Sequence, residues 1–336
     1  MRKTIFISFV VMAVLIFSAN PMWSSNVETK VTHYIDNNLI SLSDYLNYRE
    51  GDYEKIDAEK LPQKELNAFN KKMHGIYFTK NKFSWGIFTY KENRQNVGRE
   101  SLIFEIERSR QDFSREEYEL VGETMSQSLR GIFFEKEFLQ EKDIDLGIGA
   151  NLFQGLNINS RDYKSTVTAR DNILYIEGYR RRVNSSMNEE KGEDFDAWGW
   201  GMNCRISFLL TSETEITFDL KNFFNRIYWS DIYTRIMEDQ EGFYYYEDYI
   251  TSLQPQYKIG LQRQNWKTGL HLGNSNAPYL LRIFEVYGMD IKLGIYDLNL
   301  LFALESDHLN LNLISSGVNP AEIKSLGIQL SLSYDF

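Results

Sequence analysis

The alternation of apolar and polar positions over residues 326–336 is the clearest pattern in this chain. Every even position is apolar or aromatic, and every odd position is small or polar. Successive side chains of a β-strand point to opposite faces, so this segment predicts a strand with one apolar and one polar face. The apolar face consists of Leu326, Ile328, Leu330, Leu332, Tyr334 and Phe336.

The same period of two recurs along most of the chain from Met73 onward. It is clearest over 144–158, 198–210, 216–221, 257–261, 266–272 and 309–313. Ser212–Glu215 predicts a tight turn between two of these strands. The phase changes within 291–304, which indicates either a β-bulge near Ile295 or two short strands. We therefore predict an all-β, antiparallel fold of about 12 to 14 strands, with 14 favoured.

Strand alternation alone does not separate a secreted β-sandwich from a membrane barrel, but the two termini favour the barrel. Met1-Arg2-Lys3 and the apolar run 5–17 resemble a secretory signal peptide, so residues 1–19 are predicted to be a cleaved signal; a retained anchor is the alternative. The C-terminal pattern, which ends on Phe336, resembles the last strand of bacterial outer-membrane β-barrels. That resemblance implies a transmembrane barrel in the outer membrane after export, with the membrane lipid and the barrel assembly machinery as partners.

Residues 26–72 differ from the rest because they are polar and partly helical in pattern. A helix starting within 57–62 would place Leu66, Phe69 and Met73 on one face. Ser114–Glu117 matches a capping box and predicts a second short helix. The segment is too polar to span lipid, so we predict that 26–72 lies as a hatch in or under a barrel formed by 73–336.

Composition and charge exclude several classes of protein. The chain has 336 residues, 15% aromatic residues, five prolines and a net charge of −10. The negative charge argues against a nucleic-acid partner, and the low proline content suits long hydrogen-bonded ladders. Cys204 is the single cysteine, so the sequence offers neither an internal disulfide nor a thiol metal site. We expect no cofactor.

Histidines are candidate catalytic residues, because some outer-membrane barrels are lipases or proteases. His271 and Ser275 are about 13 Å apart along a strand, beyond hydrogen-bond reach unless the chain turns at Gly273. Asp307 and His308 are adjacent and face opposite ways in a strand. We expect no enzyme, and we interpret these residues, with His33 and His74, as polar groups of the rim or lumen.

The polar phase of the strands carries charges that could line the lumen. The candidates are Arg205, Asp219, Lys221, Lys258, Lys267 and His271. Either they select a solute, or they pair with one another and fill a narrow barrel. Arg180–Arg182 is a further basic cluster, which could bind the phosphate of a lipid or be a solvated strand end.

The passage Phe218-Asp-Leu-Lys-Asn222, followed by Arg226-Ile-Tyr228-Trp229, is similar to a passage in barrels of the long-chain fatty-acid transporter type. Those barrels commonly have 14 strands and an N-terminal hatch. Their N-terminal Asn-Pro-Ala element is missing, since Asn319-Pro320-Ala321 lies near the C-terminus. The resemblance implies passive transport of a small or hydrophobic solute. The alternative is a non-conducting structural or surface-binding barrel.

Overall fold

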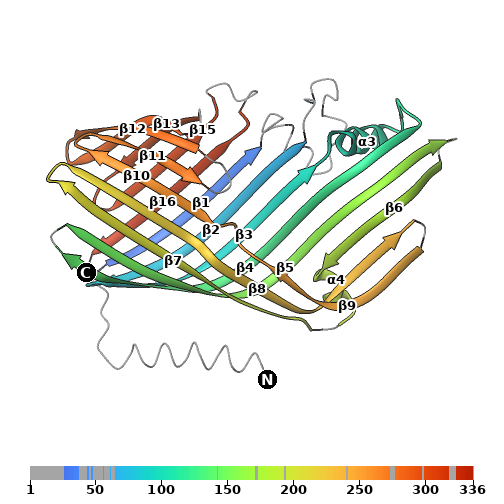
Figure 1. Cartoon of the computed structure of the whole chain (residues 1–336), viewed down its shortest axis with the longest axis horizontal. Coiled ribbons are helices and arrows are strands. Elements are labelled where there is room, and N and C mark those ends of the chain that lie inside the picture. The colour runs from blue at the N-terminus through green and yellow to red at the C-terminus, as the bar shows by residue number, and fades with distance from the viewer. Residues whose placement is uncertain are drawn as a thin grey trace.

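The computed structural model describes residues 26–37, 44, 47, 56, 61, 65–141, 143–170, 173–192, 194–239, 241–272, 277–296, 299–317 and 323–335. The strands of this part are β1 (Asn26–Asn37), β2 (Leu66–Lys80), β3 (Phe83–Val97), β4 (Glu117–Glu141), β5 (Ile144–Arg170), β6 (Ile173–Asn184), β7 (Asp196–Thr211), β8 (Thr214–Glu238), β9 (Glu241–Thr251), β10 (Gln256–Arg263), β11 (Trp266–Leu272), β12 (Ala277–Val286), β13 (Met289–Tyr296), β14 (Asn299–Glu305), β15 (Leu309–Ser315) and β16 (Leu326–Asp335). The helices described are α3 (Arg99–Arg110) and α4 (Ser186–Glu190) (Figure 1).

The strands close into an antiparallel barrel. β1 pairs with β16, with Asn26 opposite Asp335, and the first half of β8 pairs with both β7 and β10. Of the sixteen described strands, β6 and β9 lie outside this ring, which leaves a closed ring of 14. The prediction of an antiparallel barrel with 14 strands is confirmed.

The wall of the barrel is much taller on one side than on the other. β4, β5 and β8 contain 25, 27 and 25 residues, whereas β11, β14 and β15 contain 7 each. A transmembrane strand needs only about 9–11 residues, so the long strands project well beyond the bilayer. β6 and β9 pair with the projecting halves of β5 and β8 and widen this wall (Figure 1).

The two ends of the barrel differ in their connections. At the end that holds Asn26 and Asp335, adjacent strands are joined by tight turns such as Asn81-Lys82 and Tyr287-Gly288. The longest connections, those between β1 and β2, between β3 and β4, which includes α3, and between β15 and β16, are at the opposite end. Outer-membrane barrels have short periplasmic turns and long external loops, so the projecting wall faces the outside.

An apolar belt covers the outer face of the ring. Side chains such as Ile87, Leu293, Leu300 and Leu332 are about half exposed, and their neighbours along each strand point inward. A water-soluble sandwich would bury these side chains, whereas a membrane barrel presents them to lipid. The belt therefore places the barrel in the outer membrane. Among the described residues, no helix is long and apolar enough to cross a membrane.

The C-terminal strand has the predicted outer face. Ile328, Leu330, Leu332 and Tyr334 are exposed, and Leu326 is half-buried. Phe336 lies outside the described residues, as does the predicted signal peptide, 1–19. The turn at Ser212–Glu215 and the alternative of two short strands within 291–304, now β13 and β14, are confirmed.

The prediction that 26–72 is a partly helical hatch differs from the structure. Asn26–Asn37 and Leu66–Lys80 are β1 and β2, so the barrel wall begins at Asn26 and not at Met73. The helical spacing of Leu66, Phe69 and Met73 involves only three residues, and β2 instead satisfies its backbone by pairing with β1 and β3. Much of 38–64 lies outside the described residues.

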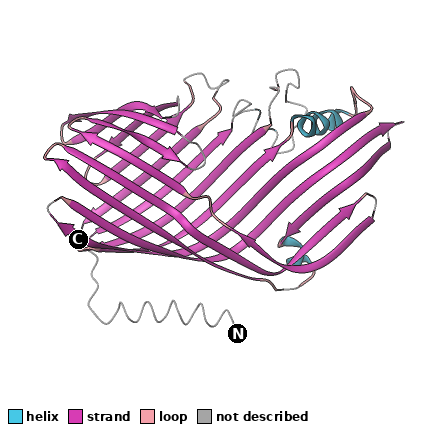
Figure 2. Ribbon diagram, in the orientation of Figure 1, coloured by secondary structure: helices cyan, strands magenta, loops and turns pink. Residues whose placement is uncertain are grey.

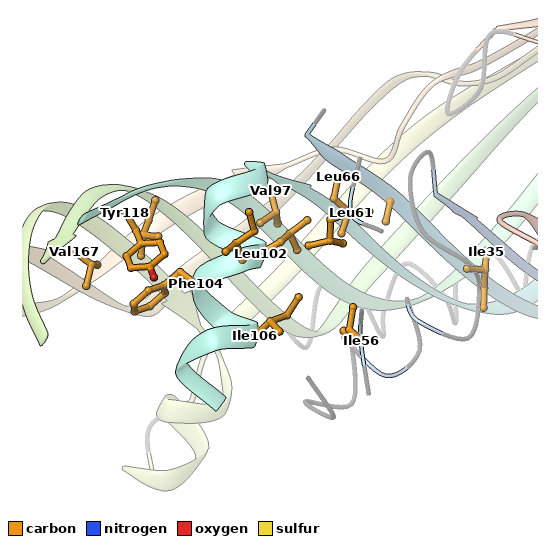
Figure 3. Packing of buried hydrophobic residues seen from close by; sticks show 13 residues of the cluster. Ile35, Ile56, Leu61, Leu66, Val97, Leu102, Phe104, Ile106, Tyr118 and Val167 are labelled. Carbon is orange, nitrogen blue, oxygen red and sulfur yellow. The ribbon is translucent and has the colours of Figure 1, made fainter. Parts of the chain in front are cut away.

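The described helix near the predicted capping box is α3, which ends before it. Ser114 follows α3 and bonds Glu107, and Glu117 already begins β4. Figure 3 shows Leu102, Phe104 and Ile106 of α3 packed in one buried cluster. The cluster also contains Leu61, Leu66, Val97, Tyr118 and Val167. Val97 and Tyr118 belong to the outward phase of β3 and β4, so α3 covers the outside of the projecting wall.

The polar segments 91–100, 159–169, 183–196 and 231–252 have the sequence character of loops. Most of 91–100, 159–169 and 231–252 is strand, whereas 183–196 holds α4 and the connection from β6 to β7. The three segments that are strand belong to the projecting parts of β3, β5, β8 and β9. Beyond the bilayer both faces of a sheet can meet water or loops, so the apolar face that marks a membrane strand is lost there.

Candidate functional site: a closed lumen

A short linker, residues 252–255, joins β9 to β10, which pair one after the other with β8 (Figure 2). The Ser252 carbonyl accepts hydrogen bonds from Arg94 of β3 at 2.9 Å and from Gln127 of β4 at 3.4 Å. β9 and β10 both pair with β8, and β5 and β7 separate β8 from β4 in the ring. The linker therefore projects from its place beside β8 into the lumen, where it contacts side chains of β3 and β4.

Side chains fix the linker in place. Asn225 Nδ2 donates to the Leu253 carbonyl at 2.9 Å, and Asn225 Oδ1 accepts from the Leu253 N–H. Trp229 Nε1 donates to Thr251 Oγ1 at 2.8 Å, and Thr251 Oγ1 donates to Gln127 Oε1 at 2.9 Å. The linker itself is outside the strand ladders. Its position in the lumen therefore depends on these side-chain hydrogen bonds and on its packing.

A buried polar network holds the wall side chains that bind the linker. Glu92 is fully buried on β3 and accepts hydrogen bonds from Tyr90 Oη at 2.6 Å and Gln127 Nε2 at 2.9 Å. It also pairs with Arg94. A buried carboxylate needs such partners, and here they orient Gln127 and Arg94 toward Ser252.

An apolar layer surrounds Leu253, whose side chain is only 2% exposed. The layer consists of Phe88, Tyr90, Leu129, Phe153, Ile227 and Trp229, all from inward positions of the wall. The rings of Phe88 and Phe153 meet edge to face at 5.9 Å. Gly155 leaves the space for this layer, because a Cβ there would lie 2.6 Å from the Trp229 ring.

The linker and its apolar layer separate two cavities, each of about 360 Å³. The outer cavity is lined by Asp36, Phe69, Arg94, Glu123 and Gln254. The periplasmic cavity is lined by Glu28, Lys30, Lys71, Arg205, Asp219, Lys221 and Leu253. The lumen thus has a cavity with charged side chains in its lining on each side of an apolar layer.

The structure places Arg205, Asp219 and Lys221 together on the periplasmic cavity. Lys221 Nζ lies 3.5 Å from Asp219 Oδ2, and both Arg205 and Lys258 are opposite Asp219 in the strand register. Lys267 belongs to the same inward phase of the sheet.

The backbone of His271 pairs with that of Lys258, but its side chain lies outside the described part. Sequence reasoning missed Lys30 and Lys71, because their segment was assigned to a hatch. The alternation of Glu28, Lys30 and Thr32 with Val27, Thr29 and Val31 was the signal that could have found them.

Within the described residues, no group of three or more histidine, cysteine or acidic side chains could hold a metal ion. Cys204 lies on β7 as a half-buried free thiol.

No family model matches the chain, and no curated protein matches it. Among solved structures, it is similar to the toluene transporter TbuX of Ralstonia pickettii, with 7% identity, a TM-score of 0.49, and coverage of 94% of this chain and 90% of the other. The deltaS2S3 mutant of the monoaromatic hydrocarbon channel TodX has 10% identity, a TM-score of 0.46 and coverage of 93% and 91%. The outer membrane protease OmpT of Escherichia coli has 7% identity, a TM-score of 0.33 and coverage of 94% and 98%.

These TM-scores lie below 0.5, so the assignment rests on the strand pairing and the outer surface of this chain. The closed ring of 14 antiparallel strands and its lipid-facing belt identify the chain as a β-barrel of the bacterial outer-membrane class.

Proposed function

We propose that this barrel is a passive outer-membrane channel for a small solute, closed in this conformation by the linker 252–255. The observation that carries the proposal is the division of one lumen into two cavities by a segment outside the strand ladders. A barrel that served only as a scaffold could fill its lumen with side chains of the wall. Here a separate segment forms the closure.

The free energy needed to displace the linker is small enough for the linker to act as a gate. Six side-chain hydrogen bonds hold residues 251–253. At about 0.5–1.5 kcal/mol each, they contribute roughly 3–9 kcal/mol in total. A conformational difference of a few kcal/mol leaves a minor open state populated, which a solute or a loosened contact can increase.

The chemistry of the closure indicates the class of solute. Phe88, Phe153 and Leu253 of the closure are apolar, whereas charged side chains are found around both cavities. A small solute with an apolar body can contact this layer without leaving a polar group unpaired. We therefore infer a small, partly hydrophobic solute, and the charges of the periplasmic cavity would contribute to its selection.

Single-channel recording in planar bilayers tests the gate. Asn225→Ala removes both hydrogen bonds to Leu253, so we expect it to open at least about tenfold more often than the wild type, as the loss of about 1.4 kcal/mol requires. Asn312→Ala is the matched control, because Asn312 bonds Asn310 of β15 and lies away from the linker. Before recording, each variant is shown to be folded, because a folded barrel migrates differently on a gel when it is unheated than after heating.

If folded Asn225→Ala conducts no more than the wild type, the gate is refuted. The non-conducting alternative, a surface-binding barrel, would then be favoured by the projecting wall of β4, β5, β6, β8 and β9, which a simple pore does not need.

A further inference from the structure

Three arginines lie side by side on three neighbouring strands of the projecting wall. Arg161 of β5 is opposite Arg182 of β6, and Arg182 is opposite Arg235 of β8. Tyr244 of β9 continues the row opposite Arg235. We call Arg161, Arg182 and Arg235 the arginine row.

The arginine row faces outward. Ile158 and Ser160 of β5 belong to the inward phase, since Ile158 packs in the lumen cluster and Ser160 bonds Tyr249. Arg161 has the opposite phase and shares it with Tyr163, which packs against the outer cluster under α3. Arg182 and Arg235 share this face through their register with Arg161.

The row is electrostatically unfavourable by itself. Guanidinium groups stay charged at any ordinary pH, and like charges directly opposite in a sheet destabilise it. Among the described residues, none of the three forms an ion pair with a carboxylate, in contrast to Arg181, which pairs with Glu247 at 2.6 Å. Glu105 and Glu190 act on Arg161 and Arg182 only from beyond ion-pair distance.

The guanidinium groups of the arginine row include an N–H donor without a hydrogen-bond acceptor among the described residues. Arg235 Nε is buried and has no hydrogen-bond partner within the described part of the chain. Its guanidinium lies 5.2 Å from the ring centre of Tyr244, the residue opposite it on β9. A polar atom that is buried without a partner costs free energy, so an anion with several oxygen atoms would relieve both the repulsion and the missing bond.

The position of the row indicates the source of that anion. Leu156, which is 40% exposed, lies five residues before Arg161 on the same strand, roughly 17 Å along it. The row therefore continues the lipid-facing surface just outside the apolar belt, on the external side of the membrane (Figure 1). Phosphate groups of membrane lipids lie at this level, and arginine binds phosphate with two parallel hydrogen bonds.

We propose that the arginine row binds the phosphate groups of a phosphorylated glycolipid in the outer leaflet. Arg161, Arg182 and Arg235 bind the phosphate oxygens, and the exposed rings of Tyr244 and Tyr246 contact the sugar or the upper acyl chain. The lipid would neutralise the row and tether the projecting wall to the membrane surface. This site is independent of the proposed channel function.

Thermal unfolding of the purified barrel in detergent micelles tests the proposal. The probe is lipid A, with dephosphorylated lipid A and inorganic phosphate as comparisons. We expect lipid A to raise the unfolding midpoint of the wild type by at least about 3 °C, and the other two to have no effect. R161Q/R182Q/R235Q should lose this shift, whereas Arg170→Gln, which removes an arginine at the end of β5, should keep it.

A second comparison separates the loss of lipid binding from a folding defect of the triple variant. Without lipid A, Arg182→Gln should unfold at the same temperature as the wild type or higher, because it relieves repulsion within the row. With lipid A, the wild type should be the more stable of the two. The proposal fails if the triple variant keeps the full shift, if Arg170→Gln loses it as well, or if inorganic phosphate alone reproduces it.

Discussion

Trp229 Nε1 donates a 2.8 Å hydrogen bond to Oγ1 of Thr251, and this bond ties β8 to the last residue of β9, directly before the lumen linker. Both side chains are buried. Thr251→Val would leave the Trp229 N–H unsatisfied, so we expect a loss of about 1–3 kcal/mol in the free energy of unfolding. Urea unfolding measures this. Thr217→Val, half-buried on β8 and far from the linker, should change it by less than about 0.5 kcal/mol; equal losses would contradict the assignment.

Two glycines on the inward face of β5 should respond differently to a methyl group. At Gly155 a Cβ would lie 2.4 Å from the Cβ of Ala197, whereas at Gly147 the nearest atom, Glu135 Oε1, is 3.3 Å away on a flexible side chain. We expect Gly155→Ala to destabilise the barrel by about 1–3 kcal/mol through overpacking. Gly147→Ala should be nearly neutral. The midpoint of urea unfolding distinguishes them, and equal midpoints would mean that the apolar layer is loosely packed.

The two faces of β7 can be tested at adjacent positions. Ile206 is opposite Phe218 on the lipid side, and Ser207 is opposite Asp145 in the lumen phase. Arginine facing lipid near the membrane centre costs about 2–4 kcal/mol, whereas in the lumen it stays hydrated and can pair with Asp145. Ile206→Arg should lower the amount of folded barrel in the outer membrane, and Ser207→Arg should not. The reverse result would invert the assignment of the faces.

The apolar face of β16 is also the proposed signal for the barrel assembly machinery. Tyr334 is exposed and lies opposite Val27 of β1. We expect Tyr334→Asp, or deletion of Phe336, to reduce assembly and leave aggregates in the periplasm. Gln329→Asn, on the inward face of the same strand, is the control. Normal membrane levels of both altered chains would rule out the signal.

The docking of α3 should weaken in acid. Burial raises the pKa of Glu107, but hydrogen bonds from Ser114 and Tyr118 outweigh it, so the pKa lies below its ordinary value of 4.5. A lowered pKa in the folded state means that the stabilisation is present above the ordinary pKa and is lost as the pH falls through the folded-state pKa. Hydrogen exchange of 99–118, corrected for intrinsic rates, should therefore lose protection below about pH 4.

Glu107→Gln should remove most of this pH dependence, because the amide does not titrate. Glu116→Gln, outside the hydrogen-bonded group, should keep it. If all three proteins behave alike, Glu107 does not control the docking of α3.

Much of the barrel could be predicted because lipid imposes a strict pattern on it. Where a strand faces lipid on one side, as Leu326–Tyr334 does, the period of two is unbroken. Where β5 and β8 rise above the bilayer, the pattern disappears and the sequence looks like loop. β1 was missed for a related reason: its outward residues include Thr29 and His33, which interrupt the apolar phase.

The site was harder to predict than the wall. The inward positions of Arg205, Asp219 and Lys221 follow from the phase of their strands. The place of the linker does not follow, because residues 252–255 carry no periodic pattern. Their position depends on Asn225 of the neighbouring β8 and on Arg94 and Gln127 of β3 and β4, which are distant in sequence. The lumen does hold a separate segment, but it comes from the β9–β10 connection and not from the described N-terminal residues.

The pairing of β1 with β16 has a consequence for the order of events in biogenesis. Nearly all other neighbours in the ring are close in sequence, but this seam joins Asn26 to Asp335 and is the most distant pairing of the chain. Until β16 has emerged from the ribosome and been delivered, β1 has an unpaired edge that can recruit any other strand. During export, folding must therefore be delayed so that β1 remains unpaired until β16 is available. A product truncated before Leu326 should be degraded rather than inserted.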